Sequence, residues 1–366
     1  MEWEKLLSLK RHGDNFKRKR IDQDETRLGF DVDYDRIIFS SEFRSLQDKT
    51  QVVPFSQGDF VHTRLTHSLE TSVVGRSLGR RVGVEILKKY PHLKKDLGYR
   101  ANDFGAIVAS ASLAHDIGNP PFGHSGEKSI GQYFMSGPGK KFGEILNDKE
   151  FQDLCDFEGN ANGFKILTQS RPGREGGLRL SYATLGAFIK YPKESLPIKP
   201  TSDVSDKKYG FFQNEKNIYF DIANELGLSK NDGGYNRHPL TFLVEAADDI
   251  CYTIIDFEDG INLGLVDEDY ALEYLINLVR DSINTEKYHS LNNTIDRVSY
   301  LRALSINTLI NEAVEIFIEN EDDILNGKFN VALLKKSKFK PQIADIIKIS
   351  IEKIYESKEV IEKEVA

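Results

Sequence analysis

The chain has 366 residues, of which 39% are hydrophobic and 29% are charged, and it carries a formal net charge of −8. This length can bury a large core without disulfides or a structural metal, so stability alone would not explain a metal site. The negative charge argues against general binding to duplex nucleic acid, and no apolar run approaches the roughly 18 residues that a membrane span requires.

Residues 1–34 are expected to form an N-terminal arm without a signal for export. Its densest cationic cluster, the segment FKRKR at 16–20, is interpreted either as a solvated or interface segment or as a contact for an anionic partner. Cys155 and Cys251 lack the spacing of a redox or zinc motif. We read them as free thiols, which favours a cytoplasmic location.

The segment 51–64, QVVPFSQGDFVHTR, has two β-prone pieces around a polar turn and predicts a small hairpin. After it, Leu65, Leu69, Val73 and Leu78 recur at helical spacing and predict a long helix. His67 lies within that helix among apolar neighbours. Taken alone, such a histidine is more often a hydrogen-bonded core residue than a metal ligand.

A second apolar helix is predicted to end at the stretch Gly118-Asn119-Pro120-Pro121, because two prolines cannot continue the hydrogen-bond ladder. His115 and Asp116 stand at that end, where an imidazole and a carboxylate can converge on one cation. Mixed nitrogen and oxygen ligation suits several first-row metals as well as Mg²⁺. His124 and Glu127 follow, one helical turn apart if a helix begins there.

The segment 192–210 has three prolines and is predicted to be a loop. Leu240, Val244 and Ala247 predict a further helix. Asp248, Tyr252 and Asp256 follow at intervals of four, which rotates them by only about 40° per step along one helix face. A solvated Asp248 and a core Tyr252 are the plainer alternatives.

Helical patterns continue over 270–279, 301–318 and 343–360. We therefore expect three parts: the arm at 1–34, a catalytic core at 35–265, and a helical support or assembly region at 266–366.

Five segments, in the order TQVVP, RLTHS, AHDIGNPPFGH, FEGNA and EAADDICY, resemble the dGTP triphosphohydrolase family of HD-domain phosphohydrolases. The resemblance runs from about residue 35 to 260, and AHDIGNPPFGH is its most specific part. It implies an all-α HD-domain fold with a small β-hairpin and additional C-terminal helices. It also implies a divalent metal ion, such as Mn²⁺, Mg²⁺ or another first-row metal, held by His67, His115, Asp116 and Asp248.

The implied reaction is hydrolysis of dGTP, or of deoxynucleoside triphosphates (dNTPs) generally, to deoxynucleoside and inorganic tripolyphosphate. His124 would act as the general acid, because histidine titrates near neutral pH, and Glu127 would orient its ring. By resemblance, Tyr252 would exclude a 2′-hydroxyl, and Asp256 and Gln51 would contact the 3′-hydroxyl. The implied phosphate contacts are Arg64, Asn160, Lys190, Tyr191 and Lys208, with Asn119 also in the substrate site.

Two positions depart from family patterns. Some relatives carry a histidine at Asn119, and some carry a phosphate-binding lysine at Asp249. Family members also continue for several tens of residues after a helix that resembles IYESKEVIEKEVA, so the resemblance leaves open whether this chain is truncated or a short member.

The resemblance implies a homo-oligomer. It leaves open the preferred dNTP, the native metal, activation by a second nucleotide, and binding of single-stranded DNA. Two alternatives stand beside it: an HD phosphohydrolase for a nucleoside monophosphate or a guanosine alarmone, and a nucleotide sensor without turnover. The presence of both His124 and Glu127 argues against the sensor.

Overall fold

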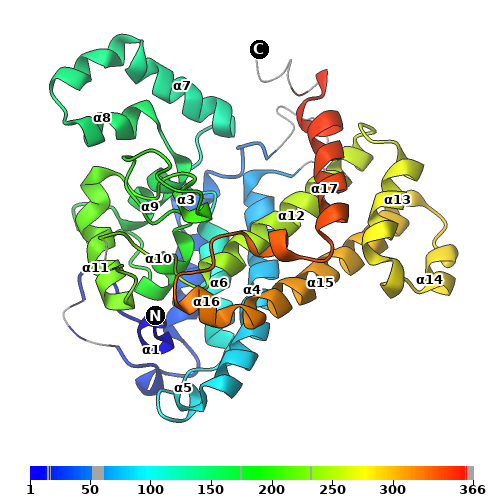
Figure 1. Cartoon of the computed structure of the whole chain (residues 1–366), viewed down its shortest axis with the longest axis horizontal. Coiled ribbons are helices and arrows are strands. Elements are labelled where there is room, and N and C mark those ends of the chain that lie inside the picture. The colour runs from blue at the N-terminus through cyan, green and yellow to red at the C-terminus, as the bar shows by residue number, and fades with distance from the viewer. Residues whose placement is uncertain are drawn as a thin grey trace.

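The computed structural model describes residues 1–14, 16, 18–51, 62–173, 175–230, 233–358 and 360. Over these ranges the chain is helical, as Figure 1 shows, and its only β-pairing consists of isolated bridges. The all-α prediction is therefore confirmed. The α-helices are α1 (Trp3–Leu6), α2 (Gly29–Ile38), α3 (Ser41–Arg44), α4 (Arg64–Lys89), α5 (Pro91–Lys95), α6 (Ala101–Ala114), α7 (Gly123–Met135), α8 (Asp148–Cys155), α9 (Gly159–Thr168), α10 (Tyr182–Phe188), α11 (Lys216–Leu226), α12 (Thr241–Asn262), α13 (Glu268–Val279), α14 (Thr285–Ser290), α15 (Thr294–Glu319), α16 (Glu321–Leu325) and α17 (Lys340–Ile349).

Short 3₁₀ segments occur at Arg20–Asp22, Pro138–Glu144, Val204–Asp206, Gln213–Glu215, Arg280–Ser282 and Leu333–Lys336, and a π-helical turn spans Ser350–Tyr355.

The helices α4 and α6 form an antiparallel pair that passes at very close range. Gly75, Gly79 and Gly83 form a stripe on α4 at four-residue spacing, which places them on one face. A Cβ at Gly79 would lie 2.6 Å from the carbonyl oxygen of Phe104 on α6, so a larger side chain would force the helices apart. This packing brings the N-terminal part of α4 to the C-terminal end of α6, where His67 and His115 lie.

The helix α12 packs against both α4 and α6, and α15 packs in turn against α12 and α4 (Figure 1). Nearly every residue of α12 is buried, including Leu243, Val244, Ile250 and Ile254, which explains its long apolar pattern. Apolar burial of this kind contributes roughly 25 cal/mol per Å² and holds the three helices at fixed positions. A polar residue such as Asp248, placed on this helix, therefore sits at a defined point in the protein.

Several local predictions can be compared with these helices. The helices expected near 65–78, 240–247, 270–279 and 301–318 lie within or across α4, α12, α13 and α15, the second apolar helix is α6, and α7 begins before His124. The C-terminal pattern differs, because α17 ends at Ile349 and a π-helical turn follows. Most of the predicted hairpin, residues 52–61, lies outside the described residues, while Thr50 and Thr63 form an isolated antiparallel bridge.

The N-terminal segment and the C-terminal region both pack onto the same body as the core. The indole nitrogen of buried Trp3 donates to Glu321 Oε1 at 2.8 Å, and the Met1 amino group donates to the carbonyl of Leu325. The division into an arm at 1–34, a core at 35–265 and a support region at 266–366 stays a prediction.

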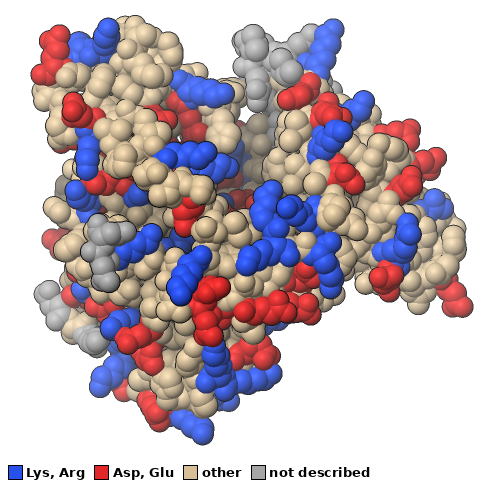
Figure 2. Space-filling view, in the orientation of Figure 1, with Lys and Arg blue, Asp and Glu red and all other residues tan. Residues whose placement is uncertain are grey.

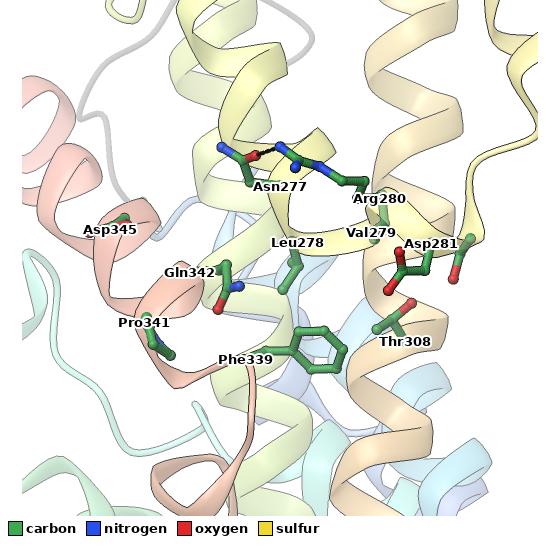
Figure 3. A pocket seen from close by; sticks show the side chains of 11 residues that line it. Asn277, Leu278, Val279, Arg280, Asp281, Thr308, Phe339, Pro341, Gln342 and Asp345 are labelled. Atoms are coloured by element: carbon green, nitrogen blue, oxygen red, sulfur yellow. Dashed lines mark hydrogen bonds between the residues drawn. The ribbon is translucent and has the colours of Figure 1, made fainter.

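Acidic and basic side chains are intermixed over the face shown in Figure 2. None of the helices in the described ranges is both long and apolar enough to cross a membrane. A cavity of about 490 Å³ lies between α13, α15 and α17, lined by residues such as Arg280, Thr308 and Gln342 (Figure 3). None of the predicted site residues lines it.

Candidate metal centre and active site

The start of α4 places two of the predicted residues one turn apart. Thr63 caps the helix, since its hydroxyl accepts from the backbone of Thr66 while the Thr66 hydroxyl accepts from the backbone of Thr63. Such a reciprocal cap fixes where a helix begins. Arg64 is therefore the first helical residue, and His67 follows on the buried side with 1% of its surface exposed.

The end of α6 presents His115 and Asp116. The His115 ring donates from Nδ1 to the carbonyl oxygen of Ser112 at 2.6 Å, which leaves Nε2 to face the other side chains. The Asp116 Oδ1 accepts from Arg64 Nη1 at 2.9 Å and from Asn119 Nδ2 at 2.5 Å. The other oxygen, Asp116 Oδ2, is buried and has no hydrogen-bond partner in the described part of the chain.

Asp248 on α12 lies beside both histidines. Its Oδ1 lies 3.2 Å from His67 Nε2 and 3.5 Å from His115 Nε2, and its Oδ2 accepts from Lys190 Nζ at 2.6 Å. We call His67, His115, Asp116 and Asp248 the metal cluster. One ligand atom each from His67, His115 and Asp116 lie within 4.8 Å of one another, close enough to share an ion.

The charges in the metal cluster also suit a divalent cation. Burial opposes ionisation, but the positive charge of Arg64 helps to hold the pKa of Asp116 below its ordinary value, and that of Lys190 holds the pKa of Asp248 well below its own. Burial lowers the pKa of His115, which favours the neutral ring, whereas burial opposes protonation of His67 but Asp248 holds the pKa of that ring above its ordinary value. Ionised carboxylates and a neutral imidazole are the forms that bind metal. Together with the unpartnered oxygen of Asp116, they show that this donor set fits a metal ion.

His124 and Glu127 lie on the first turn of α7 as a hydrogen-bonded pair. The ring Nδ1 lies 2.7 Å from Glu127 Oε2, and Glu127 Oε1 accepts from the backbone of Gly159 at 2.8 Å. The His124 side chain is 77% exposed and Glu127 only 11%. Burial opposes ionisation of Glu127, but His124 and Lys208 hold its pKa below the ordinary value. A fixed carboxylate thus orients an accessible imidazole.

Arg64 lies between the metal cluster and the start of α7. It bonds Asp116 through Nη1, and its Nη2 stands so close to Gly123 that a Cβ there would lie 2.7 Å away. Gly123 directly precedes His124. No described hydrogen bond or ion pair joins His124 itself to the metal cluster.

The predicted phosphate contacts fall into two groups. Lys190 pairs with Asp248, and Tyr191 lies buried beside it. On the α7 side, Lys208 Nζ lies 2.9 Å from Glu158 Oε2, and Asn160 Nδ2 donates to Glu158 Oε1 at 2.6 Å. A cavity of about 570 Å³ borders this second group and is lined by His124, Glu127, Glu158 and Lys208, among others.

The predicted sugar contacts lie further along α12. Tyr252 stacks on Tyr355 with ring centroids 5.5 Å apart and planes 6° from parallel. The Tyr355 hydroxyl donates to Asp256 Oδ2 at 2.7 Å, while Asp256 Oδ1 is buried without a described partner. Gln51 is half-buried, and its Oε1 also lacks a described partner. The described contacts do not join Gln51 to Asp256.

Tyr355 and Lys49 are among the residues of this neighbourhood that sequence reasoning missed. Tyr355 comes from the π-helical turn after α17, and no motif or spacing linked it to Tyr252 more than one hundred residues earlier. Lys49 donates from Nζ to the carbonyl oxygen of Asn119 at 2.6 Å. Its position just before TQVVP was the one available signal.

Comparison with known proteins agrees with this geometry. The HD domain family matches residues 64–157. A "deoxyguanosinetriphosphate triphosphohydrolase-like protein" of Synechocystis sp. is 43% identical over all of this chain and 83% of its own length. A protein of the same name from Pseudomonas aeruginosa is 41% identical over 90% of this chain and 73% of its own length.

A further relative, the "deoxyguanosinetriphosphate triphosphohydrolase" of Yersinia pseudotuberculosis, is 32% identical over 93% of this chain and 74% of its own length. By these likenesses and by its HD domain, the chain belongs to the deoxyguanosinetriphosphate triphosphohydrolase family of HD-domain proteins.

Proposed function

We propose that this protein hydrolyses a deoxynucleoside triphosphate to the deoxynucleoside and inorganic tripolyphosphate, with a divalent metal ion held by His67, His115, Asp116 and Asp248. The observation that carries the proposal is the convergence of these four side chains from α4, α12 and the end of α6, next to an oriented histidine. A metal ion bound there would acidify a water molecule and polarise a phosphoryl oxygen.

In the proposed reaction, a water oxygen forms a bond to the α-phosphorus and releases a proton to solvent, as the bond from phosphorus to the 5′ oxygen breaks. The leaving alkoxide takes a proton from His124, whose Nδ1 is engaged with Glu127 and whose Nε2 is therefore the donor. Arg64, Lys190 and Lys208 supply positive charge, and Tyr191, Asn160 and Asn119 supply polar contacts, for the triphosphate.

Selection for a deoxyribose is proposed to come from Tyr252, Asp256 and Gln51. The Tyr252 ring is held in place by stacking on Tyr355, so it can exclude a 2′-hydroxyl by its bulk. The unpartnered oxygens of Asp256 and Gln51 can accept from the 3′-hydroxyl. Assembly as a homo-oligomer and a cytoplasmic location belong to the same proposal.

The test is product analysis. The purified protein is incubated with each of the four dNTPs and with GTP, in Mn²⁺ or Mg²⁺, and the products are separated by anion-exchange chromatography. We expect equimolar deoxynucleoside and tripolyphosphate, with GTP cleaved much more slowly. Release of orthophosphate or pyrophosphate, or hydrolysis of a nucleoside monophosphate or a guanosine alarmone only, would contradict the proposal. Nucleotide binding without any hydrolysis would instead indicate a sensor.

A further inference from the structure

Arg237 lies outside every motif that pointed to the site, yet it connects two segments that form it. It precedes α12 and is 5% exposed. Its Nε donates to the backbone carbonyl of Lys190 at 2.6 Å. Its Nη1 and Nη2 donate to the two carboxylate oxygens of Glu245 at 2.8 and 3.0 Å. Because Arg237 is buried and each guanidinium nitrogen donates to a partner inside the protein, we expect it to act on the site through its neighbours.

These bonds close a ring of contacts that includes Asp248 of the metal cluster. Glu245 and Asp248 are three residues apart on α12. The Nζ of Lys190 donates to Asp248 Oδ2 at 2.6 Å, so Lys190 also contacts α12. Arg237 thus fixes the backbone of Lys190 to α12, and the ammonium group of Lys190 contacts the same helix. A long lysine side chain has about 2 kcal/mol of rotamer entropy, so its ammonium group can occupy many positions. Fixing the backbone of Lys190 reduces the number of positions that its ammonium group can reach.

The ring is held by strong and directional interactions. Burial alone would raise the pKa of Glu245, but Arg237 lowers it below the ordinary value, so the pair is ionised. Two parallel bonds between a guanidinium and a carboxylate give a fixed geometry that a single contact cannot. The rings of Tyr191 and Phe242 lie under the guanidinium, with its central carbon 5.8 and 5.1 Å from their centroids.

We infer that Arg237 is a positioning residue: by bracing the Lys190 backbone against Glu245, it sets where the Lys190 ammonium meets the phosphates of the substrate. This inference rests on the proposed function, because it assumes that Lys190 contacts phosphate during hydrolysis. A displacement of about 1 Å in a positioned group can cost about 100-fold in rate. We therefore expect loss of the brace to lower kcat/KM by about 10- to 100-fold.

The test uses variants that leave no isolated buried charge. Removing one partner of a buried ion pair strands the other, so Arg237→Gln is combined with Glu245→Gln. The double variant should fold and show the 10- to 100-fold fall in kcat/KM. Arg237→Lys keeps the charge but not the two-pronged geometry, so we expect a smaller fall. The matched control is Arg302→Gln with Glu258→Gln, which removes a 2.7 Å ion pair between α15 and the same helix α12. It should change kcat/KM by less than about threefold.

A double-mutant cycle then separates positioning from general damage. In a Lys190→Ala background, the Arg237→Gln and Glu245→Gln changes should lower kcat/KM by less than about threefold more, because the group they position is gone. The inference is overturned if the full fall persists in that background. It is also overturned if the brace variant keeps wild-type kcat/KM while Lys190→Ala alone impairs the enzyme.

Failure of the proposed function has a different signature, since the wild-type protein would then hydrolyse no dNTP. Crystal structures of the wild type and the brace variant, grown in the same conditions, decide the inference in that case. A displaced Lys190 Nζ in the variant supports the positioning role. An unchanged Nζ position overturns it, whatever the substrate proves to be.

Discussion

Replacing Glu127 by glutamine should slow the chemical step without affecting the metal cluster. The carboxylate accepts two hydrogen bonds, from His124 Nδ1 at 2.7 Å and from the Gly159 backbone at 2.8 Å, and its side chain is 11% exposed. An amide of the same shape keeps the volume, but it loses the charge that orients and stabilises a protonated imidazole.

The size of the effect follows from the bond to His124. A hydrogen bond to a charged group contributes about 1.5–3 kcal/mol, and each 1.36 kcal/mol of barrier is a factor of ten in rate. Glu127→Gln should therefore lower kcat by about 10- to 150-fold. His124→Ala removes the proton donor itself and should lower kcat by about 10²- to 10⁴-fold.

The assay is tripolyphosphate release at saturating dNTP, with Mn²⁺ affinity measured on the same samples by titration calorimetry. Metal affinity should stay within about twofold, because neither residue belongs to the metal cluster. Glu42→Gln is a suitable control, since the Glu42 side chain is similarly buried at 13% exposed but pairs with Arg171 instead. A kcat for Glu127→Gln within twofold of wild type, or a loss of metal that parallels the loss of rate, would refute the reasoning.

Three further changes should each affect a different function of the site. Asp116→Asn should weaken Mn²⁺ binding by more than about 100-fold in calorimetry, because even residues that only hydrogen-bond to metal ligands contribute about 10- to 100-fold to metal affinity. Unchanged affinity would exclude Asp116 as a ligand. Tyr252→Ala should raise kcat/KM for a ribonucleotide relative to the matching dNTP by about 10-fold or more in competition assays, and an unchanged ratio would exclude the steric role. Burial raises the pKa of Asp256 to about 7, so its carboxyl is mostly neutral at pH 6 and mostly ionised at pH 8. The ionised form is the stronger acceptor for a 3′-hydroxyl, so the KM of the wild type should fall between pH 6 and pH 8. The KM of Asp256→Asn should show no such fall. A pH dependence common to both enzymes would contradict this assignment.

Much of the helical framework could be predicted from local patterns. The apolar period of α4, α6 and α12 is long and regular, and the two prolines after Asn119 mark the end of a helix without any tertiary information. His67 and Asp248 stand out as polar residues within such apolar helices, and His115 and Asp116 stand at a helix end, but only the resemblance to HD-domain phosphohydrolases joined the four into one ligand set. Their distances, however, depend on the glycine stripe that lets α4 approach α6, which no local pattern measures.

The residues that the sequence did not reveal are those whose partners are remote. Tyr355 meets Tyr252 and Asp256 only because α17 and the π-helical turn that continues it pack against α12. Its π-helical turn also breaks the 3.6-residue period on which helix prediction depends. Arg237 and Glu245 are eight residues apart, but their joint action on Lys190 appears only in three dimensions.

The central claim concerns one metal ion shared by four side chains, and anomalous diffraction tests it most directly. Crystals of the protein grown with Mn²⁺ should show one strong anomalous peak at coordination distance from His67, His115, Asp116 and Asp248. That peak should be lost in crystals of Asp116→Asn grown in the same way. A manganese peak elsewhere, or a fully occupied peak in which two or more of these side chains do not touch the ion, would contradict the account.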